Sequence, residues 1–255
     1  MDFGIANRTA LVCAASAGLG FACAQALARE GVAVTITGRD AKKLDAAARR
    51  LREETGAAIT TAAGDITTEE GRALAFAACP TPDILITNAG GPPVGDFRRF
   101  TPAQWQAAIN ANMLTPIALM QHVVDGMMKR RFGRIINITS AAVKSPMAGL
   151  ALSNTARTGL TGFTAGLARE VAWANVTINN MLPGPFDTAR LRGTMGEDEA
   201  TAEREIAKRA ERIPARRIGR PEEFGATCAF LCSAQAGYLI GQNILLDGGA
   251  FNSTF

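Results

Sequence analysis

Two side chains of contrasting chemistry stand one helical turn apart in G-L-A-L-S-N-T-A-R-T-G-L, residues 149–160. A serine hydroxyl such as that of Ser153 has no ionisation near neutral pH, and an arginine such as Arg157 does not give up its proton. Neither group is suited to general acid–base catalysis. A fixed guanidinium beside a hydroxyl is instead suited to hold a carboxylate or another anion through charge-assisted hydrogen bonds. The alternative is that both side chains cap and brace the helix on which they lie.

A second stretch that could carry chemistry is C-A-A-S-A-G-L-G, residues 13–20. Gly18 and Gly20 let the backbone approach a phosphate, and a helix beginning near Leu19 would direct its free amide groups at that charge. The pattern predicts a nucleotide-binding loop. Taken alone, the two glycines are equally compatible with an ordinary turn between a strand and a helix.

Short runs of β-branched residues alternate with longer amphipathic stretches along the chain. This pattern predicts strands at residues 9–14, 32–37, 57–63, 83–88, 134–139, 176–182 and 243–247. It predicts helices at residues 19–30, 40–55, 67–78, 101–129, 152–174 and 221–232. The long helix opens at Thr101-Pro102, which supplies an N-cap and a proline at the first helical position. Continuous apolar strands separated by helices are typical of a parallel sheet covered on both faces.

We therefore predict the α/β fold class: a single-domain doubly wound parallel sheet, Rossmann-like, with about seven strands and helices on both faces over residues 1–255. Ligands of such a sheet bind beyond the carboxyl ends of its strands. Residues 187–213 are polar and charged, which predicts a mobile, partly helical substrate flap. The flap arginines, among them Arg190 and Arg192, could steer an anionic ligand or simply form a solvated charged face.

The composition argues against several classes of function. The 255 residues carry a formal net charge of +4 without any block of five like charges, so we expect no nucleic-acid partner. No apolar run reaches 18 residues and no basic segment followed by an apolar one opens the chain, so we expect no membrane partner and a cytoplasmic location. The five cysteines are scattered and His122 is the only histidine, so we expect buried reduced thiols and no metal site.

Seven motifs follow one another from the loop at 13–20 to the segment G-Q-N-I-L-L-D-G-G at 241–249. Between these two come G-D-I at 64–66, N-A-G at 88–90, Asn112, Ser140 and P-G-P at 183–185. In this order and spacing they resemble the short-chain dehydrogenase/reductase family, most closely its 3-oxoacyl-carrier-protein reductases, along nearly the whole chain. Cys13 and Ala14 replace the Thr-Gly of that family's glycine motif. We expect the methyl group of Ala14 to crowd the turn while cofactor binding survives.

The resemblance implies a dinucleotide cofactor. Asp65 corresponds to the residue that meets the adenine, and Thr188 to one that meets the nicotinamide carboxamide. After the second predicted strand, an acidic residue would bind the ribose 2′-hydroxyl of NAD, but the chain has Gly38 and Arg39 there. A guanidinium pairs with a 2′-phosphate, so NADP(H) is the predicted cofactor, the alternative being that Arg39 is a solvated loop residue. The implied cofactor-binding residues are Ser16, Gly18, Leu19, Gly20, Arg39, Asp65, Ile66, Asn88, Ala89, Gly90, Pro183, Gly184 and Thr188.

The resemblance also implies the catalytic residues. In the family a serine holds the substrate oxygen, a tyrosine transfers the proton, a lysine lowers the pKa of that tyrosine, and an asparagine holds a water of the proton relay. Ser140 and Asn112 match, but Ser153 and Arg157 occupy the positions of the tyrosine and the lysine. The same replacement, together with G-G-P-P at 90–93, resembles a divergent branch of reductase-like proteins. The candidate catalytic residues are therefore Ser140, Asn112, Ser153 and Arg157.

General acid–base help is typically worth about 10²–10⁴ in rate, whereas orientation of the hydride donor and acceptor is retained. We expect a slow or altered oxidoreductase acting on a small-molecule carbonyl or alcohol, with anionic and thioester-linked substrates both open. The competing expectation is a catalytically impaired nucleotide-binding or scaffold protein of the same fold. The helices at 101–129 and 152–174 resemble those that join family tetramers and carry small residues for close packing. They predict a homotetramer, with a dimer as the alternative, and the small residues are Ala156, Gly159, Gly162 and Gly166.

Overall fold

The computed structural model describes residues 2–196 and 198–254, and in this part of the chain seven parallel strands form one sheet. The strand order is β3-β2-β1-β4-β5-β6-β7, so the direction of winding reverses between β1 and β4. A reversal of this kind opens a crevice at the carboxyl ends of the strands. The strands are β1 (Thr9–Val12), β2 (Ala33–Gly38), β3 (Ile59–Ala63), β4 (Ile84–Thr87), β5 (Gly133–Ile138), β6 (Val176–Pro183) and β7 (Asn243–Leu246). The predicted doubly wound α/β fold is confirmed.

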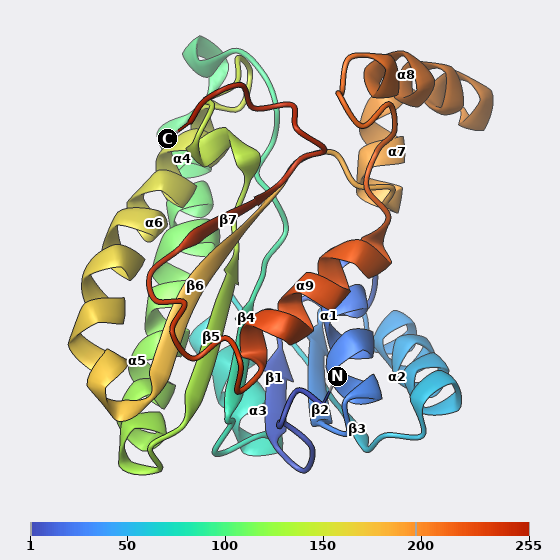
Figure 1. The fold of residues 1–255 in the computed structure, drawn as a ribbon. Helices are drawn as coiled ribbons and strands as arrows, with labels where there is room; N and C mark the ends of the chain where they lie inside the picture. Colours follow the sequence, from blue (N-terminus) through green and yellow to red (C-terminus); the bar gives the residue numbers. More distant parts are fainter. Residues whose placement is uncertain (1, 197, 255) are drawn as a thin grey trace.

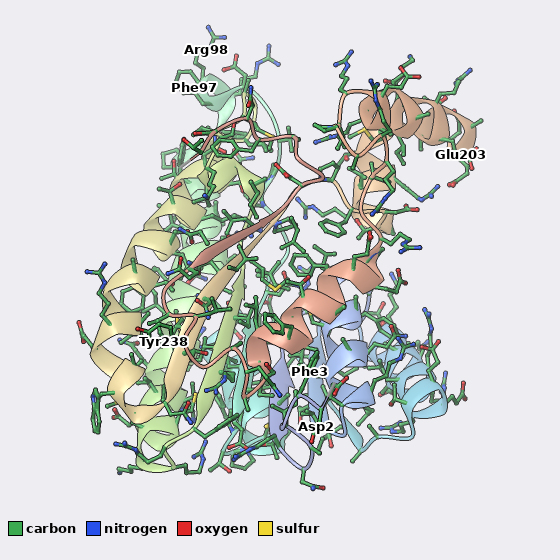
Figure 2. All side chains as sticks on the ribbon, in the orientation of Figure 1. Asp2, Phe3, Phe97, Arg98, Glu203 and Tyr238 are labelled. Carbon is green, nitrogen blue, oxygen red and sulfur yellow. The ribbon has the colours of Figure 1, made fainter. Side chains whose placement is uncertain are left out.

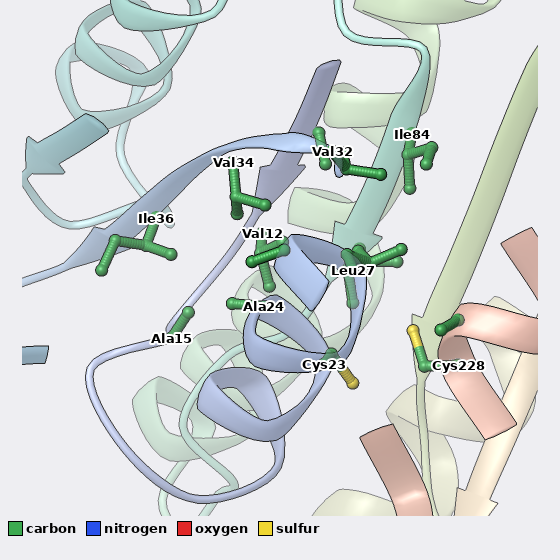
Figure 3. Close-up of a cluster of buried hydrophobic side chains, with 14 of the residues drawn as sticks. Val12, Ala15, Cys23, Ala24, Leu27, Val32, Val34, Ile36, Ile84 and Cys228 are labelled. Carbon is green, nitrogen blue, oxygen red and sulfur yellow. The ribbon is translucent and has the colours of Figure 1, made fainter. Parts of the chain in front are cut away.

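Helices cover both faces of the sheet (Figure 1). Helices α1, α2 and α9 form one apolar core with the sheet, and α3, α5 and α6 form a second core on the opposite face. In Figure 3, Ala24 and Leu27 of α1 lie among the sheet residues Val12 and Ile84 of the first core. The helices are α1 (Gly18–Arg29), α2 (Ala41–Thr55), α3 (Glu69–Ala78), α4 (Pro102–Ile109), α5 (Thr115–Lys129), α6 (Ala151–Val171), α7 (Ala189–Met195), α8 (Glu199–Glu211) and α9 (Pro221–Cys232).

The helix predicted at residues 101–129 is not continuous. Its start is confirmed, because the Thr101 hydroxyl accepts a hydrogen bond from the amide of Gln104 and the Gln104 side chain accepts one from the amide of Thr101. A π-helical turn, η2 (Asn110–Leu114), then separates α4 from α5. Such a turn inserts one extra residue into the helix and is frequent at functional sites. The hydrophobic period of the sequence gives no sign of it, because a single π turn only rotates the helix face.

A ladder of buried polar side chains crosses the sheet from β4 to β7. Thr87 and Asn137 are paired in the register of β4 and β5, Asn137 and Asn180 in that of β5 and β6, and Asn180 and Asn243 in that of β6 and β7. The Asn137 carboxamide accepts a hydrogen bond from the Thr87 hydroxyl (2.6 Å) and donates to the side-chain oxygens of Asn180 (3.0 Å) and Thr164 (3.1 Å). Asn180 in turn donates to the Asn243 side chain (2.9 Å). These bonds are satisfied only in one register, so the ladder aligns the strand ends that carry the site.

The turn after β1 is strained at a residue with a side chain. Ala14 adopts φ +47°, in the left-handed region where a Cβ costs roughly 1–2 kcal/mol. Its amide nevertheless donates to the Thr37 hydroxyl (3.2 Å). The effect of the Ala14 methyl group is therefore backbone strain, because glycine adopts this left-handed conformation more readily. It also explains why β1 ends at Val12 rather than at residue 14.

The segment after β6 forms α7 and α8, which stand away from the carboxyl edge of the sheet in Figure 1. The predicted helical content of residues 187–213 is confirmed. Two backbone hydrogen bonds hold the base of this flap, from the amide of Asp187 to the Gly219 carbonyl (2.8 Å) and from the amide of Gly219 to the Pro185 carbonyl (3.0 Å).

Replacement of Asn137 by leucine should destabilise the fold by about 2–4 kcal/mol, because it leaves the buried partners Thr87, Asn180 and Thr164 without their hydrogen bonds. Urea unfolding followed by circular dichroism measures this change. Asn252→Leu, at an exposed position, is the control and should leave the unfolding midpoint unchanged. A loss below about 0.5 kcal/mol for Asn137→Leu, within the range of ordinary surface substitutions, would mean that the ladder does not support the sheet.

Ala14→Gly should stabilise the protein by about 0.5–1 kcal/mol, since relief of the left-handed strain exceeds the extra chain entropy that glycine loses on folding. For a chain of this size the gain corresponds to an increase in Tm of about 1–4 °C. The matched substitution Gly18→Ala, at φ +60°, should lower Tm. A lower Tm for Ala14→Gly as well would show that the methyl group contributes packing that outweighs the strain.

Candidate active site

The glycine loop between β1 and α1 forms an anion-binding end of the site. Helix α1 begins at Gly18, and the amide of Phe21 makes the first bond back to the Ala17 carbonyl, so the amides of Gly18, Leu19 and Gly20 have no partner within the helix. A Cβ on Gly20 would lie 2.5 Å from the Ala14 carbonyl oxygen. Only glycine fits there, which brings the helix start close to the strand end, as a diphosphate site requires.

Asn88 supports this loop. Its side-chain amide donates to the Ala14 carbonyl (3.4 Å), so it braces the strained turn from the end of β4. Beyond it, a Cβ added to Gly90 would meet no atom within 4 Å, which means that the backbone after Ala89 borders open space. In the N-A-G motif, the Asn88 side chain therefore supports the glycine loop, and the backbone at Gly90 is open on the side of the crevice.

Three residues predicted to bind the adenosine end come together past β2 and β3. Ser16 lies beside Gly38, since a Cβ on that glycine would be 3.5 Å from the Ser16 hydroxyl oxygen. The pKa of Asp65 lies below its ordinary value, mainly because its carboxylate accepts hydrogen bonds from the amide (3.0 Å) and the hydroxyl (2.8 Å) of Thr67. The positive charge of Arg39, which is exposed, makes a smaller contribution in the same direction. Asp65 thus stays ionised and oriented, while the neighbouring Ile66 is buried.

Ser140 and Arg157 meet at the carboxyl end of β5. Ser140 is the second residue after the strand, and its hydroxyl accepts a hydrogen bond from the amide of Ala142 (3.1 Å). Arg157 reaches from α6 so that its Nη1 donates to the carbonyls of Ile138 (2.8 Å) and Thr139 (2.5 Å). The guanidinium is therefore anchored at the residue that precedes Ser140.

Ser153 lies one turn before Arg157 on α6 and is 8% exposed. Within residues 2–196 and 198–254 its hydroxyl makes no hydrogen bond and is not a buried orphan atom, so it borders solvent-accessible space. Arg157 is thus anchored on the residue before Ser140 and follows Ser153 by one helical turn, while the joint role of the three side chains stays a prediction.

The protonation state of Arg157 limits the chemistry of the site. Burial, and to a smaller extent the positive charge of Arg190, lower the pKa of Arg157 to about 10. A pKa near 10 still leaves the side chain protonated at neutral pH. Arg157 is therefore a fixed positive charge and a hydrogen-bond donor, not a group that exchanges protons during turnover.

Asn112 lies in the π turn η2 and is buried. Its side-chain amide donates to the Ala108 carbonyl (3.3 Å), four residues earlier. The π turn packs against α6, where a Cβ on Gly159 would lie 2.6 Å from the Met113 sulfur. The expectation that Ala156 serves packing between subunits is wrong, because this residue is fully buried within the fold, whereas Gly159 is exposed and its role between subunits stays a prediction.

The P-G-P turn and the flap close the other side of the crevice. A Cβ on Gly184 would lie 2.8 Å from the Asp247 Cα, so this position must be glycine for β6 and β7 to end side by side. After Pro183 and Gly184 the chain passes to Thr188, whose hydroxyl caps α7 through the amide of Leu191 (3.2 Å). The Thr188 methyl lies 3.6 Å from the Cβ position of Gly18, which brings the flap against the glycine loop.

Sequence reasoning gave too little weight to Arg190 and did not find the Thr87–Asn137–Asn180 ladder. Arg190 donates from Nη1 to the Gly91 carbonyl (3.2 Å) and lies directly over that glycine. Arginines were visible in the flap, but nothing in the sequence showed which of them contacts the loop after β4. The only tyrosine, Tyr238, is 99% exposed in the loop that enters β7 at its amino end, far from the carboxyl edge (Figure 2).

Other kinds of site are absent from the described residues. In ranges 2–196 and 198–254, no three histidine, cysteine or carboxylate side chains are grouped so that they could hold a metal ion. No helix in these ranges has the length and apolarity needed to cross a membrane. The five cysteines are buried and unpaired, as expected.

Comparisons with known proteins agree with this geometry. A family model described as enoyl-(acyl carrier protein) reductase matches residues 13–250. The acetoacetyl-CoA reductase of Shinella zoogloeoides is 36% identical over 96% of this chain and 99% of its own length. Dehydrogenase/reductase SDR family member 4 of Oryctolagus cuniculus is 33% identical over 96% of this chain and 94% of its own.

Among solved structures, L-sorbose reductase from Gluconobacter frateurii in complex with NADPH and L-sorbose superposes with a TM-score of 0.94. It is 29% identical, and the match covers 99% of this chain and 100% of that one. The motifs, the strand order and these matches agree over nearly the full length. The chain belongs to the short-chain dehydrogenase/reductase family.

Proposed function

We propose that the protein is an NADP(H)-dependent oxidoreductase that transfers a hydride between the cofactor and a carbonyl or alcohol substrate. The observation that carries this proposal is the built dinucleotide site, in which the free amides at the start of α1 lie next to a glycine that cannot be substituted. The phosphate-binding loop takes the diphosphate, and Ser16 with Arg39 takes the 2′-phosphate. The NADPH-bound L-sorbose reductase, which shares the fold at a TM-score of 0.94, supports the choice of cofactor.

Catalysis would rest on orientation and charge. When bound, NADPH supplies the hydride that the carbonyl carbon accepts. Ser140 donates a hydrogen bond to the carbonyl oxygen, and Arg157 stabilises the negative charge that develops there. Ser153 would be the third polar side chain beside the carbonyl oxygen. Because none of these groups releases a proton near neutral pH, the alcohol oxygen takes its proton from water.

A site without a general acid should be slow but not inert. The lost acid–base term is about 10²–10⁴ in rate, while positioning of donor and acceptor contributes a term of similar or larger size. Asn112 would hold a water in the opened helix at η2, close to the site that needs a proton source.

The alternative function is a catalytically impaired nucleotide-binding or scaffold protein. The observation that favours it is the side chain of Arg157, which is anchored on two carbonyls and keeps its proton.

The protein would act as a single domain, with residues 187–213 as the flap over its substrate. We also propose a homotetramer. Exposed apolar side chains lie on α6, at the end of the π turn η2 and just after α6, and the exposed glycines Gly162 and Gly166 would let a second helix approach closely. The exposed apolar residues of this surface are Leu114, Phe163 and Trp173.

Calorimetric titration of the purified protein should show micromolar binding of NADPH and much weaker binding of NADH. Arg39→Ala should reduce the affinity for NADPH by about 10- to 100-fold, because one charge-assisted contact to the 2′-phosphate is lost, and should leave NADH binding unchanged. Arg49→Ala, which removes an exposed arginine from the neighbouring helix α2, is the control. If neither nucleotide binds, the protein is not a dinucleotide-dependent oxidoreductase.

Restoring the proton donor should accelerate the reaction. The double variant Ser153→Tyr, Arg157→Lys should increase kcat for NADPH-dependent reduction of a carbonyl by about 10-fold or more, since it returns part of the acid–base term. Acetoacetyl-CoA and L-sorbose are suitable trial substrates, and NADPH absorbance is the readout. Ser153→Phe, Arg157→Lys is the matched control without the hydroxyl. Equal rates for the two double variants would show that proton transfer does not limit the enzyme.

A further inference from the structure

The guanidinium of Arg157 keeps most of its donors free. An arginine has five N–H groups, and Nη1 uses its two on the Ile138 and Thr139 carbonyls. Nε is buried and has no partner in the described residues. Nη2 makes no hydrogen bond there either and is not buried, so it borders accessible space. Three donors therefore remain, one more than a single carbonyl oxygen usually accepts.

Arg190 presents a second guanidinium to the same crevice. It is an exposed residue in the first turn of the flap helix α7, and its Nη1 donates to the Gly91 carbonyl. Gly91 follows β4 and Thr139 follows β5, and these two strands are neighbours whose residues Thr87 and Asn137 are paired in register. The two arginines are thus anchored on loops that leave adjacent strands at the same edge of the sheet.

Neither guanidinium has a carboxylate partner in residues 2–196 and 198–254. The neighbouring arginines do: Arg192 pairs with Asp187 (2.7 Å) and with Glu199 (2.5 Å), and Arg217 pairs with Glu223. Within the flap, Arg192 and Lys208 are thus paired, whereas Arg190 reaches the loop after β4 through its bond to Gly91 and carries its charge to the side of the sheet where Arg157 is anchored. The charge of Arg190 lowers the pKa of Arg157, so the two cations repel each other across the crevice. An anion between them would turn this repulsion into attraction.

We propose that Arg157 and Arg190 together bind a carboxylate of the substrate, so that the enzyme acts on keto acids in preference to neutral ketones. This inference rests on the proposed function and names its substrate class. Arg157 has enough donors to hold the carboxylate and the carbonyl oxygen at once, which places the carboxylate within a few bonds of the reacting carbon. Arg190 approaches the same carboxylate from the flap, so substrate binding draws the flap towards the sheet.

The cofactor diphosphate is the other anion within reach of Arg190, because Thr188 of the same helix start lies beside Gly18. It does not account for Arg157, which lies on the side of Ser140 and α6. The diphosphate is also served by the free amides of α1. The substrate carboxylate is the one anion that both arginines can share.

Binding of small probes to the protein saturated with NADP⁺ tests the inference without turnover. The probes are pyruvate, acetoacetate and levulinate, which space the carboxylate one, two and three bonds from the ketone carbon, each compared with its uncharged methyl ester by calorimetry. We expect one acid to bind at least about 10-fold more tightly than its ester. Arg190→Gln should reduce the affinity for that acid by about 10- to 100-fold and leave the ester unchanged.

Three variants complete the experiment. Arg157→Gln should reduce the affinity for the acid as much as Arg190→Gln does. Arg157→Lys retains the positive charge and should recover part of that affinity, and it replaces the glutamine variant if that variant folds poorly. Arg204→Gln, at an exposed position of α8, is the control and should bind the acid as the native protein does. The affinity for NADPH is measured in each variant.

Two results would overturn the inference. The first is equal affinity for every acid and its ester. The second is an Arg190→Gln variant that loses affinity for NADPH and not for the acid, which would assign Arg190 to the diphosphate. Failure of the proposed function is recognised separately. It would appear as selective binding of the acid without reduction by NADPH, or as the absence of NADPH binding.

Discussion

The register of the parallel sheet is the constraint on which the site depends. The loops that carry Gly18, Asn88, Ser140 and Gly184 leave four different strands, and they converge only if those strands end in the observed alignment. The side chains of Thr87, Asn137, Asn180 and Asn243, the first three of them buried, pair in sequence across β4 to β7, and a shift by one residue would break every pair. Apolar strands alone would tolerate more slippage, because one buried β-branched residue packs much like another. The polar ladder adds specificity where precise positioning matters.

The site combines rigid and strained parts. Gly20 and Gly184 are enclosed by backbone that excludes any side chain, whereas Ala14 has a side chain in a conformation suited to glycine. The strain at Ala14 persists because its neighbours hold the turn from two sides, through the Thr37 hydroxyl and the Asn88 amide. Replacement of a motif glycine by alanine has thus left the geometry of the phosphate loop intact, at some cost in stability.

Ser153 and Arg157 limit the kind of chemistry that the proposed site would perform. Neither side chain exchanges a proton near neutral pH, so the site as we propose it would hold a charge and not move a proton. The Arg157 guanidinium is desolvated, yet its two backbone carbonyl partners stabilise the charged form, and its pKa remains well above neutrality. Arg157 and Arg190 together bring two positive charges to the crevice, and a neutral carbonyl substrate would need only one of them. The second charge is the reason to look for an acidic substrate.

Much of this could be predicted from the sequence by itself. Hydrophobic runs of strand length separated by amphipathic stretches determine a doubly wound α/β sheet, because each strand must be covered on both faces. The glycine loop was identifiable from its residue types, whereas N-A-G, Ser140 and P-G-P were identified through the resemblance to the short-chain dehydrogenase/reductase family. The tertiary structure decided the rest. The π turn at η2, the left-handed Ala14, the contact of Arg190 with Gly91 and the ladder that runs from Thr87 through three asparagines all depend on groups far apart in the chain. Local pattern cannot show them, since the partners that make each one favourable meet only after the strands have been brought into register.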